Sequence, residues 1–84
     1  MKNKLYVGNL DPKVNKKQLI DLFSQVGKVK KVHVVTDKET GASKGFGFVE
    51  LNNHKEAKKA IERLNGKELE GKRINVNEAG SRDE

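Results

Sequence analysis

Two phenylalanines two residues apart, Phe46 and Phe48, are the residues of this 84-residue chain whose type and spacing are most informative about chemistry. They belong to the segment KGFGFVEL, residues 44–51. Successive side chains of a strand point to opposite faces, so Lys44 and Glu50 share a face with the two phenylalanines. Burying these two charges without partners would cost several kcal/mol each, which indicates a face that meets solvent. Aromatic rings on such a face predict a ligand with flat surfaces.

The same alternation extends this face over the other expected strands. In the segment that begins at Lys4, Tyr6 lies on the side of the lysine, while Leu5 and Val7 point to the core. Aromatic rings stack on bases, lysine and arginine neutralise phosphates, and asparagine and histidine hydrogen-bond the base edges that unpaired nucleotides expose. The candidate binding residues are therefore Tyr6, Phe46, Phe48, Lys4, Lys31, Lys44, His33, Arg73, Asn75 and Asn77.

Two amphipathic helices are expected to lie behind these strands. Asn15 followed by Gln18 is typical of a capping box at the start of the first helix. Gly27 is expected to end that helix as a left-handed cap. The second helix repeats the arrangement, with Asn53, Glu56 and Gly66 in the three corresponding positions.

The order of elements predicts the fold class. Residues 37–43 are expected to form a hairpin loop, and residues 67–72 are expected to form no further element. Gly45 and Gly47 are expected to let a helix approach the sheet closely. The order βαββαβ is that of an α+β, ferredoxin-like fold, with a four-stranded antiparallel sheet and both helices on one face. This leaves the aromatic face of the sheet open. The expected strands cover roughly residues 4–9, 30–36, 45–51 and 73–77.

Composition limits the classes of function. The net charge of +6 and the pI of about 9.7 favour a polyanionic partner, such as nucleic acid or an anionic membrane surface. Lysines that merely keep a small domain in solution would explain the charge equally well. The chain has no cysteine, and its two histidines, His33 and His54, are far apart, so neither a disulfide framework nor a metal site is expected. No cofactor is implied.

The length predicts one domain over residues 1–84, with a core at about 4–79 and a disordered tail at 80–84. No apolar run reaches the roughly 20 residues of a membrane span. The first residues lead directly into a strand and leave no room for a signal peptide. We therefore expect a cytoplasmic protein that does not enter a membrane, and a monomer.

With these motifs in the expected order, the chain resembles the RNA recognition motif family. Residues 44–51 match the family pattern K/R-G-F/Y-G/A-F-V-x-F/Y at six of its seven constrained positions. The segment LYVGNL, residues 5–10, is similar to the partner hexamer of the family, and the resemblance runs from about residue 4 to 79. The mismatch, Leu51, falls on the core side, where it should affect packing and leave the stacking surface unchanged. The short chain is similar to the stand-alone single-domain members of the family found in bacteria.

The resemblance implies roles for individual residues. Tyr6 and Phe48 would each stack on a base, and Phe46 would pack against sugar rings or insert between two nucleotides. Lys44 would pair with a phosphate, and residues 77–79 would offer main-chain and polar contacts to a base.

The leading hypothesis is sequence-tolerant, non-catalytic binding of short single-stranded RNA, in RNA processing, RNA chaperoning or post-transcriptional regulation. Stacking does not distinguish RNA from single-stranded DNA, so DNA binding is an alternative. A protein-interaction module of the same fold is another, and the helix face around Lys16 and Lys58 offers a surface for a protein partner. An enzyme is not expected, because the chain has no nucleophile beside a base, no carboxylate pair on a shared face and no phosphate loop.

Overall fold

The computed structural model describes residues 3–79, so the tail expected at residues 80–84 lies outside the described residues. Within these described residues, eight elements follow one another. They are β1 (Lys4–Gly8), α1 (Lys16–Phe23), β2 (Val29–Thr36), β3 (Ser43–Leu51), α2 (His54–Leu64), β4 (Glu68–Leu69), β5 (Lys72–Arg73) and β6 (Asn75–Glu78).

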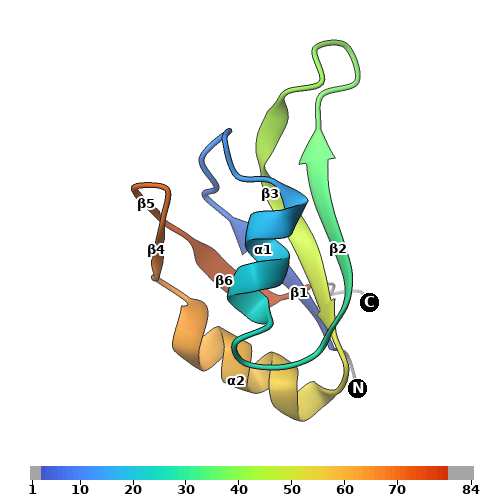
Figure 1. Cartoon of the computed structure of the whole chain (residues 1–84), viewed down its shortest axis with the longest axis vertical. Coiled ribbons are helices and arrows are strands. Elements are labelled where there is room, and N and C mark those ends of the chain that lie inside the picture. Colours follow the sequence, from blue (N-terminus) through green and yellow to red (C-terminus); the bar gives the residue numbers. More distant parts are fainter. Residues whose placement is uncertain (1–2, 80–84) are drawn as a thin grey trace.

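Four of the strands form one antiparallel sheet in the order β2-β3-β1-β6. Both helices lie on the same side of this sheet, and β2 and β3 extend beyond it as a long hairpin (Figure 1). The predicted α+β, ferredoxin-like arrangement is confirmed. Within residues 3–79 no helix lies on the opposite side of the sheet, which we call the open face.

The core lies between the sheet and the helices. The inward side chains of β1 and β3 that alternation predicts, among them Leu5 and Val49, are fully buried, and Val32 and Val34 of β2 pack partly buried against them. Leu51 is also fully buried, so this position contributes to packing, as expected. The helices complete the core with Leu19, Leu22, Phe23, Ala57, Ala60 and Leu64.

The two helices begin differently. In α1 the capping box is complete, because the side chains of Asn15 and Gln18 each accept a 3.0 Å hydrogen bond from the backbone N–H of the other. In α2 the Asn53 side chain accepts from the Glu56 N–H at 2.9 Å, as expected. The Glu56 carboxylate, however, accepts from the backbone N–H of Lys28, at 2.9 Å. The prediction of a second capping box was therefore wrong: Glu56 ties α2 to the connection between α1 and β2.

This tie also explains Gly27. The first helix ends at Phe23, and its C-cap, Ser24, has right-handed helical angles, so the predicted left-handed cap at Gly27 was wrong. A Cβ at Gly27 would lie 2.7 Å from Oε1 of Glu56, so a side chain there would displace the carboxylate. At the end of α2, in contrast, Gly66 has the positive φ of +87° that suits glycine.

Residues 67–72 form an element that the sequence analysis did not expect. Strands β4 and β5 pair as a small hairpin, with Glu68 opposite Arg73. Glu70 (φ +53°) and Gly71 (φ +81°) are the two turn residues, and positive φ at both positions is what a tight two-residue hairpin turn requires. The prediction of no further element here was wrong. Its partly buried Leu69 packs against the core.

Candidate nucleic-acid interface

The strand register arranges the open face in rows. Residues directly opposite each other in antiparallel strands share a face and lie side by side. One row, which we call the central row, crosses all four strands, and a second, the charged row, crosses three. The central row is His33, Phe48, Tyr6 and Asn77, and the charged row is Lys31, Glu50 and Lys4.

The three aromatic side chains expected on this face form one cluster. The ring of Tyr6 lies 5.8 Å from that of Phe46 and 6.0 Å from that of Phe48, measured between centroids. The two phenylalanine rings are 6.3 Å apart and nearly perpendicular, at 89°. All three side chains are half-buried, so each ring packs against its neighbours and still meets solvent. We call this group the aromatic cluster.

Gly8 supports the aromatic cluster, a role that the sequence analysis missed. It lies two residues after Tyr6 on β1, and therefore on the same face. A Cβ at Gly8 would lie 2.7–2.9 Å from three atoms of the tyrosine side chain, including its hydroxyl oxygen. The ring thus lies down over this glycine. The two-residue spacing from Tyr6 is the signal that could have revealed it.

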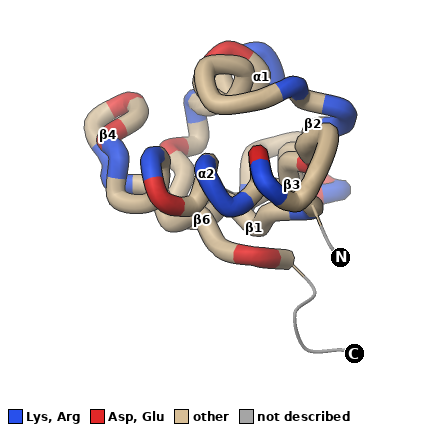
Figure 2. Tube along the Cα trace, turned by 90° about the horizontal axis from the view of Figure 1, so that it is seen from below, with Lys and Arg blue, Asp and Glu red and all other residues tan. Residues whose placement is uncertain are grey.

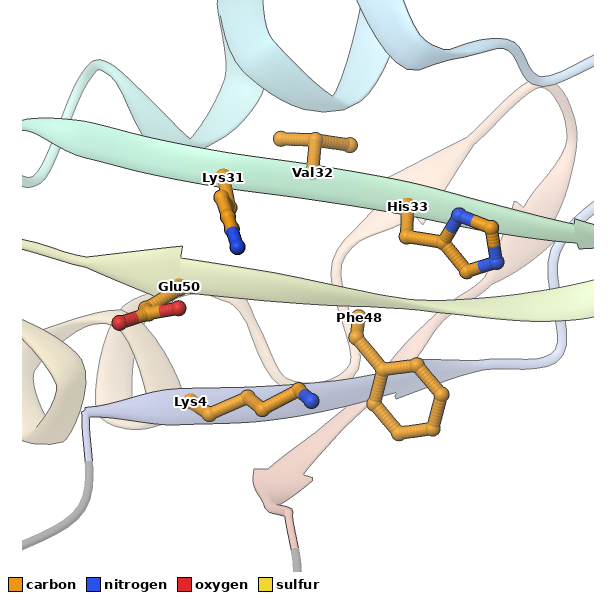
Figure 3. Close-up of a pocket in the computed structure, with 6 residues that line it drawn as sticks. All are labelled: Lys4, Lys31, Val32, His33, Phe48 and Glu50. Atoms are coloured by element: carbon orange, nitrogen blue, oxygen red, sulfur yellow. The ribbon is translucent and has the colours of Figure 1, made fainter.

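The charged row borders the aromatic cluster. The Lys4 ammonium lies 5.2 Å from the centre of the Phe48 ring, within the range of a cation–π contact. Figure 3 shows the lysine side chain running along β1 toward that ring. Together with Lys31 and Glu50, these residues line a hollow of about 440 Å³ on the sheet.

Lys44 lies in a stretch of β3 where the regular alternation of strand side chains does not hold. The pairing of β2 with β3 shifts between Val34, opposite Gly47, and Thr36, opposite Ser43. Within this irregular stretch Gly45 has a φ of +87°, outside the range of a regular strand. Alternation therefore cannot be carried from Phe46 back to Lys44, and the position of this lysine on the Phe face stays a prediction. Its side chain is exposed.

The two glycines of β3 lie next to backbone atoms of neighbouring segments and not next to a helix. This corrects the expectation that they let a helix approach the sheet closely. A Cβ at Gly47 would collide with the backbone carbonyl of His33 on the adjacent strand β2. A Cβ at Gly45 would come within 3.4 Å of the Leu10 carbonyl, which lies beyond β1.

Arg73 is not part of the four-stranded sheet, contrary to the prediction. It lies in β5, where it pairs with Glu68, and Ile74 separates it from β6. Its carbonyl accepts a 2.7 Å hydrogen bond from the Asn9 side chain, just after β1. Asn75, opposite Gly8, and Asn77, opposite Tyr6, do lie on β6 as expected, and both are exposed.

Charge alone does not mark the open face. Lysines and arginines occur on both helices and on the small hairpin as well as on the sheet, with acidic residues among them (Figure 2). Among residues 3–79 no three His, Cys, Asp or Glu side chains come together as metal ligands. In that same part of the chain, no helix is long and apolar enough to cross a membrane. The aromatic cluster therefore distinguishes this face better than the charge does.

Comparison with known proteins agrees with the motifs and the geometry. The family model described as RNA recognition motif matches residues 5–75. The chain belongs to the RNA recognition motif family. Among its relatives are two cyanobacterial proteins, each named putative RNA-binding protein RbpA. The one from Nostoc is 44% identical over 95% of this chain, and the one from Synechocystis is 46% identical over 94% of it. In both cases the match covers 78% of the relative's own length. The resemblance to single-domain bacterial members is thereby confirmed.

Other relatives are longer. The chain is 49% identical to a 29 kDa chloroplastic ribonucleoprotein of Arabidopsis thaliana, over 95% of this chain, and spans 23% of that protein. The relatives are named RNA-binding proteins and ribonucleoproteins, which confirms that this RNA recognition motif is not an enzyme.

Solved structures show the same fold. A crystal structure titled RNA binding protein PG1 superposes with a TM-score of 0.89 at 44% identity, covering 96% of this chain and 98% of that one. A structure titled as a complex of the Sex-lethal protein with RNA has a TM-score of 0.89 at 29% identity, covering 94% of this chain and 47% of its own.

Proposed function

We propose that this RNA recognition motif binds short single-stranded RNA on its open face, without catalysis. The observation that carries the proposal is the aromatic cluster, three half-exposed rings on the side of the sheet that no helix covers. A stacked base contributes about 1–3 kcal/mol on such a ring, and a single strand can splay its bases to reach several rings.

The residues around the cluster supply the other contacts. Lys4 and Lys31 border it on β1 and β2, and they would neutralise phosphates. His33 and Asn77 stand at the two ends of the central row, where they would hydrogen-bond the edges of bases stacked on Phe48 and Tyr6. Asn75 and Phe46 extend this surface by one more row. Lys44 and Arg73, at the irregular ends of the sheet, would contact the RNA backbone beyond it.

The names of similar proteins support RNA as the ligand. The cyanobacterial relatives are named RNA-binding proteins, and two similar structures are titled as complexes with RNA, one of them the Rna15 domain with bound GU. The chain covers 84% of that Rna15 chain, with a TM-score of 0.84 at 28% identity.

The test is a titration of a labelled uridine pentamer with the wild-type protein and two variants. Phe48→Ala removes one stacking surface and should weaken binding by about ten- to a hundredfold. Ile20→Ala is the matched control, because it removes a hydrophobic side chain that is 40% exposed on α1, on the helix side. Equal affinities for wild type and Phe48→Ala would contradict the proposal.

A parallel titration with the deoxy pentamer separates RNA from DNA, since only contacts to the 2′-hydroxyl favour RNA. Salt dependence gives a further check, with a log–log slope of about −0.7 for each phosphate contacted. We further propose that residues 4–79 act as one monomeric domain. A cytoplasmic location, a role in RNA processing and a protein partner on the helix face stay predictions.

A further inference from the structure

The hollow at the edge of the aromatic cluster contains a carboxylate that RNA binding alone does not explain. We propose that Glu50 makes this hollow selective for guanine, by accepting hydrogen bonds from the Watson–Crick edge of a base stacked on Phe48. This inference rests on the proposed function, because it names the base that one subsite of the open face prefers.

The position of Glu50 is fixed by the register. It pairs with Lys4 on one side and Lys31 on the other, and it follows Phe48 by two residues on the same face of β3. Phe48 and Glu50 stand at opposite ends of the hollow, Lys4 runs along β1 from the Glu50 end toward Phe48, and Lys31 lies on β2 on the other side (Figure 3). None of the side-chain hydrogen bonds found among residues 3–79 engages the Glu50 carboxylate, so its oxygens are available to a ligand.

A carboxylate at this place argues that the hollow itself holds a base, so that the phosphates neutralised by Lys4 and Lys31 would lie along its rim and not inside it. Two lysines without an acid between them would form a simple phosphate site. Glu50 would repel a phosphate held there, since both groups are negative. The hollow combines an aromatic wall, two donors and one acceptor, which matches the face and the edge of a neutral heterocycle.

Guanine fits this combination better than the other bases. A carboxylate only accepts hydrogen bonds, and its two oxygens are suited to two adjacent donors. The N1–H and N2–H groups of guanine are adjacent donors, and its O6 beside them accepts from an ammonium group. Adenine, cytosine and uracil each present a single donor group on that edge, next to one or two acceptors, and so lack two adjacent donor groups. Guanine therefore satisfies Glu50 and a neighbouring lysine together.

A purely structural role for Glu50 is the competing explanation. Opposite charges directly across strands stabilise a sheet slightly. In that case, replacing Glu50 would lower the thermal stability slightly. It would also raise the affinity for every RNA, because one negative charge leaves the binding face. Guanine selectivity predicts the opposite sign for guanine alone.

The experiment compares pentamers that differ only in the central base of a uridine background. The central base is guanine, adenine, uracil or hypoxanthine, which lacks the N2 amino group and so keeps one of the two donors. Wild-type protein should bind the guanine pentamer about ten- to a hundredfold more tightly than the adenine and uracil pentamers, with hypoxanthine in between. Glu50→Gln should remove this preference while leaving the uracil pentamer bound equally or more tightly.

The control is Glu62→Gln, which removes the same charge from an exposed position on α2 and should leave the ratio of guanine to adenine binding unchanged. Thermal unfolding of both variants verifies the fold. Equal wild-type affinity for all four pentamers would overturn guanine selectivity and leave RNA binding in place. The same holds if Glu50→Gln changes all four affinities by one factor. If the wild type binds none of them, the proposed function fails and the inference with it.

Discussion

The centre of the sheet and its irregular places, at Gly45, at Ile74 and between Val29 and Lys31 of β2, differ in how they hold the candidate binding residues. In the centre, every neighbouring pair from Lys4 opposite Glu50 to Val7 opposite Gly47 follows a regular register, and the aromatic cluster stands on it. At one end, the chain bulges at Gly45 just before the cluster. At another, it breaks at Ile74, between the small hairpin and β6.

This difference separates two kinds of contact. Stacking and base-edge hydrogen bonds need side chains in fixed places, and their candidates, Tyr6, Phe48 and Asn77, lie on regular strands. Phosphate contacts tolerate looser placement, because they orient the ligand without reading its sequence. Two of their candidates, Lys44 and Arg73, lie at the irregular ends. We therefore expect substitutions in the centre to affect folding and stacking, and those at the ends to affect mainly the salt-dependent part of binding.

The largest effect should come from Gly47→Ala, in the centre. The added Cβ would meet three backbone atoms of β2, the carbonyl oxygen and carbon of His33 and the Cα of Val34, at 3.1 Å from the last. Backbone atoms of a paired strand cannot move aside as a side chain can. We expect a loss of about 1–3 kcal/mol in the free energy of unfolding, measured by urea denaturation.

Lys44→Ala, on the same strand but at its irregular end, is the matched control for stability. It should change the free energy of unfolding by less than about 0.5 kcal/mol, because the side chain is exposed. Equal stability of Gly47→Ala and Lys44→Ala would remove the distinction between centre and end.

A smaller effect, on binding and not on stability, is expected from Gly8→Ala. The new methyl group would meet the far end of the Tyr6 side chain, which can rotate away and so would no longer lie in its stacking position. Affinity for the uridine pentamer should fall roughly three- to tenfold, a part of the energy of one stacked base. In the background of Tyr6→Ala the same substitution should have no further effect, which a double-mutant cycle measures. An undiminished effect in that background would show that the glycine acts through another residue.

The smallest effect is expected from Arg73→Ala, at the end of the sheet. Since Arg73 lies in the small hairpin, its removal should weaken binding about twofold or less at physiological salt.

Lys31→Ala, in the charged row, should weaken binding of all sequences and make the salt slope shallower by about 0.7. If Arg73→Ala gives the larger change in slope, the irregular ends contribute more to binding than the comparison implies.

Sequence reasoning succeeded where the backbone is regular. The faces of Tyr6, Phe46 and Phe48 followed from alternation and from the charges of Lys4 and Glu50, which lie in the regular part of the sheet, and the order of elements predicted the fold. It failed where the backbone leaves the regular pattern: the positive φ of Gly45 interrupts the alternation between Phe46 and Lys44, and the turn at Glu70 and Gly71 places Arg73 in a separate hairpin. The partner of Glu56 was also out of reach, because an acid three residues after an N-cap is compatible with a local box and with a distant backbone N–H.

The mutual packing of the three rings has a consequence for the thermodynamics of association. Each ring of the aromatic cluster already touches the other two, and Gly8 lets Tyr6 lie flat within it. The rotational freedom of these side chains is thus largely lost when the chain folds, before any ligand arrives. An incoming strand would have to give up only its own flexibility, which makes the protein side of the interface preorganised.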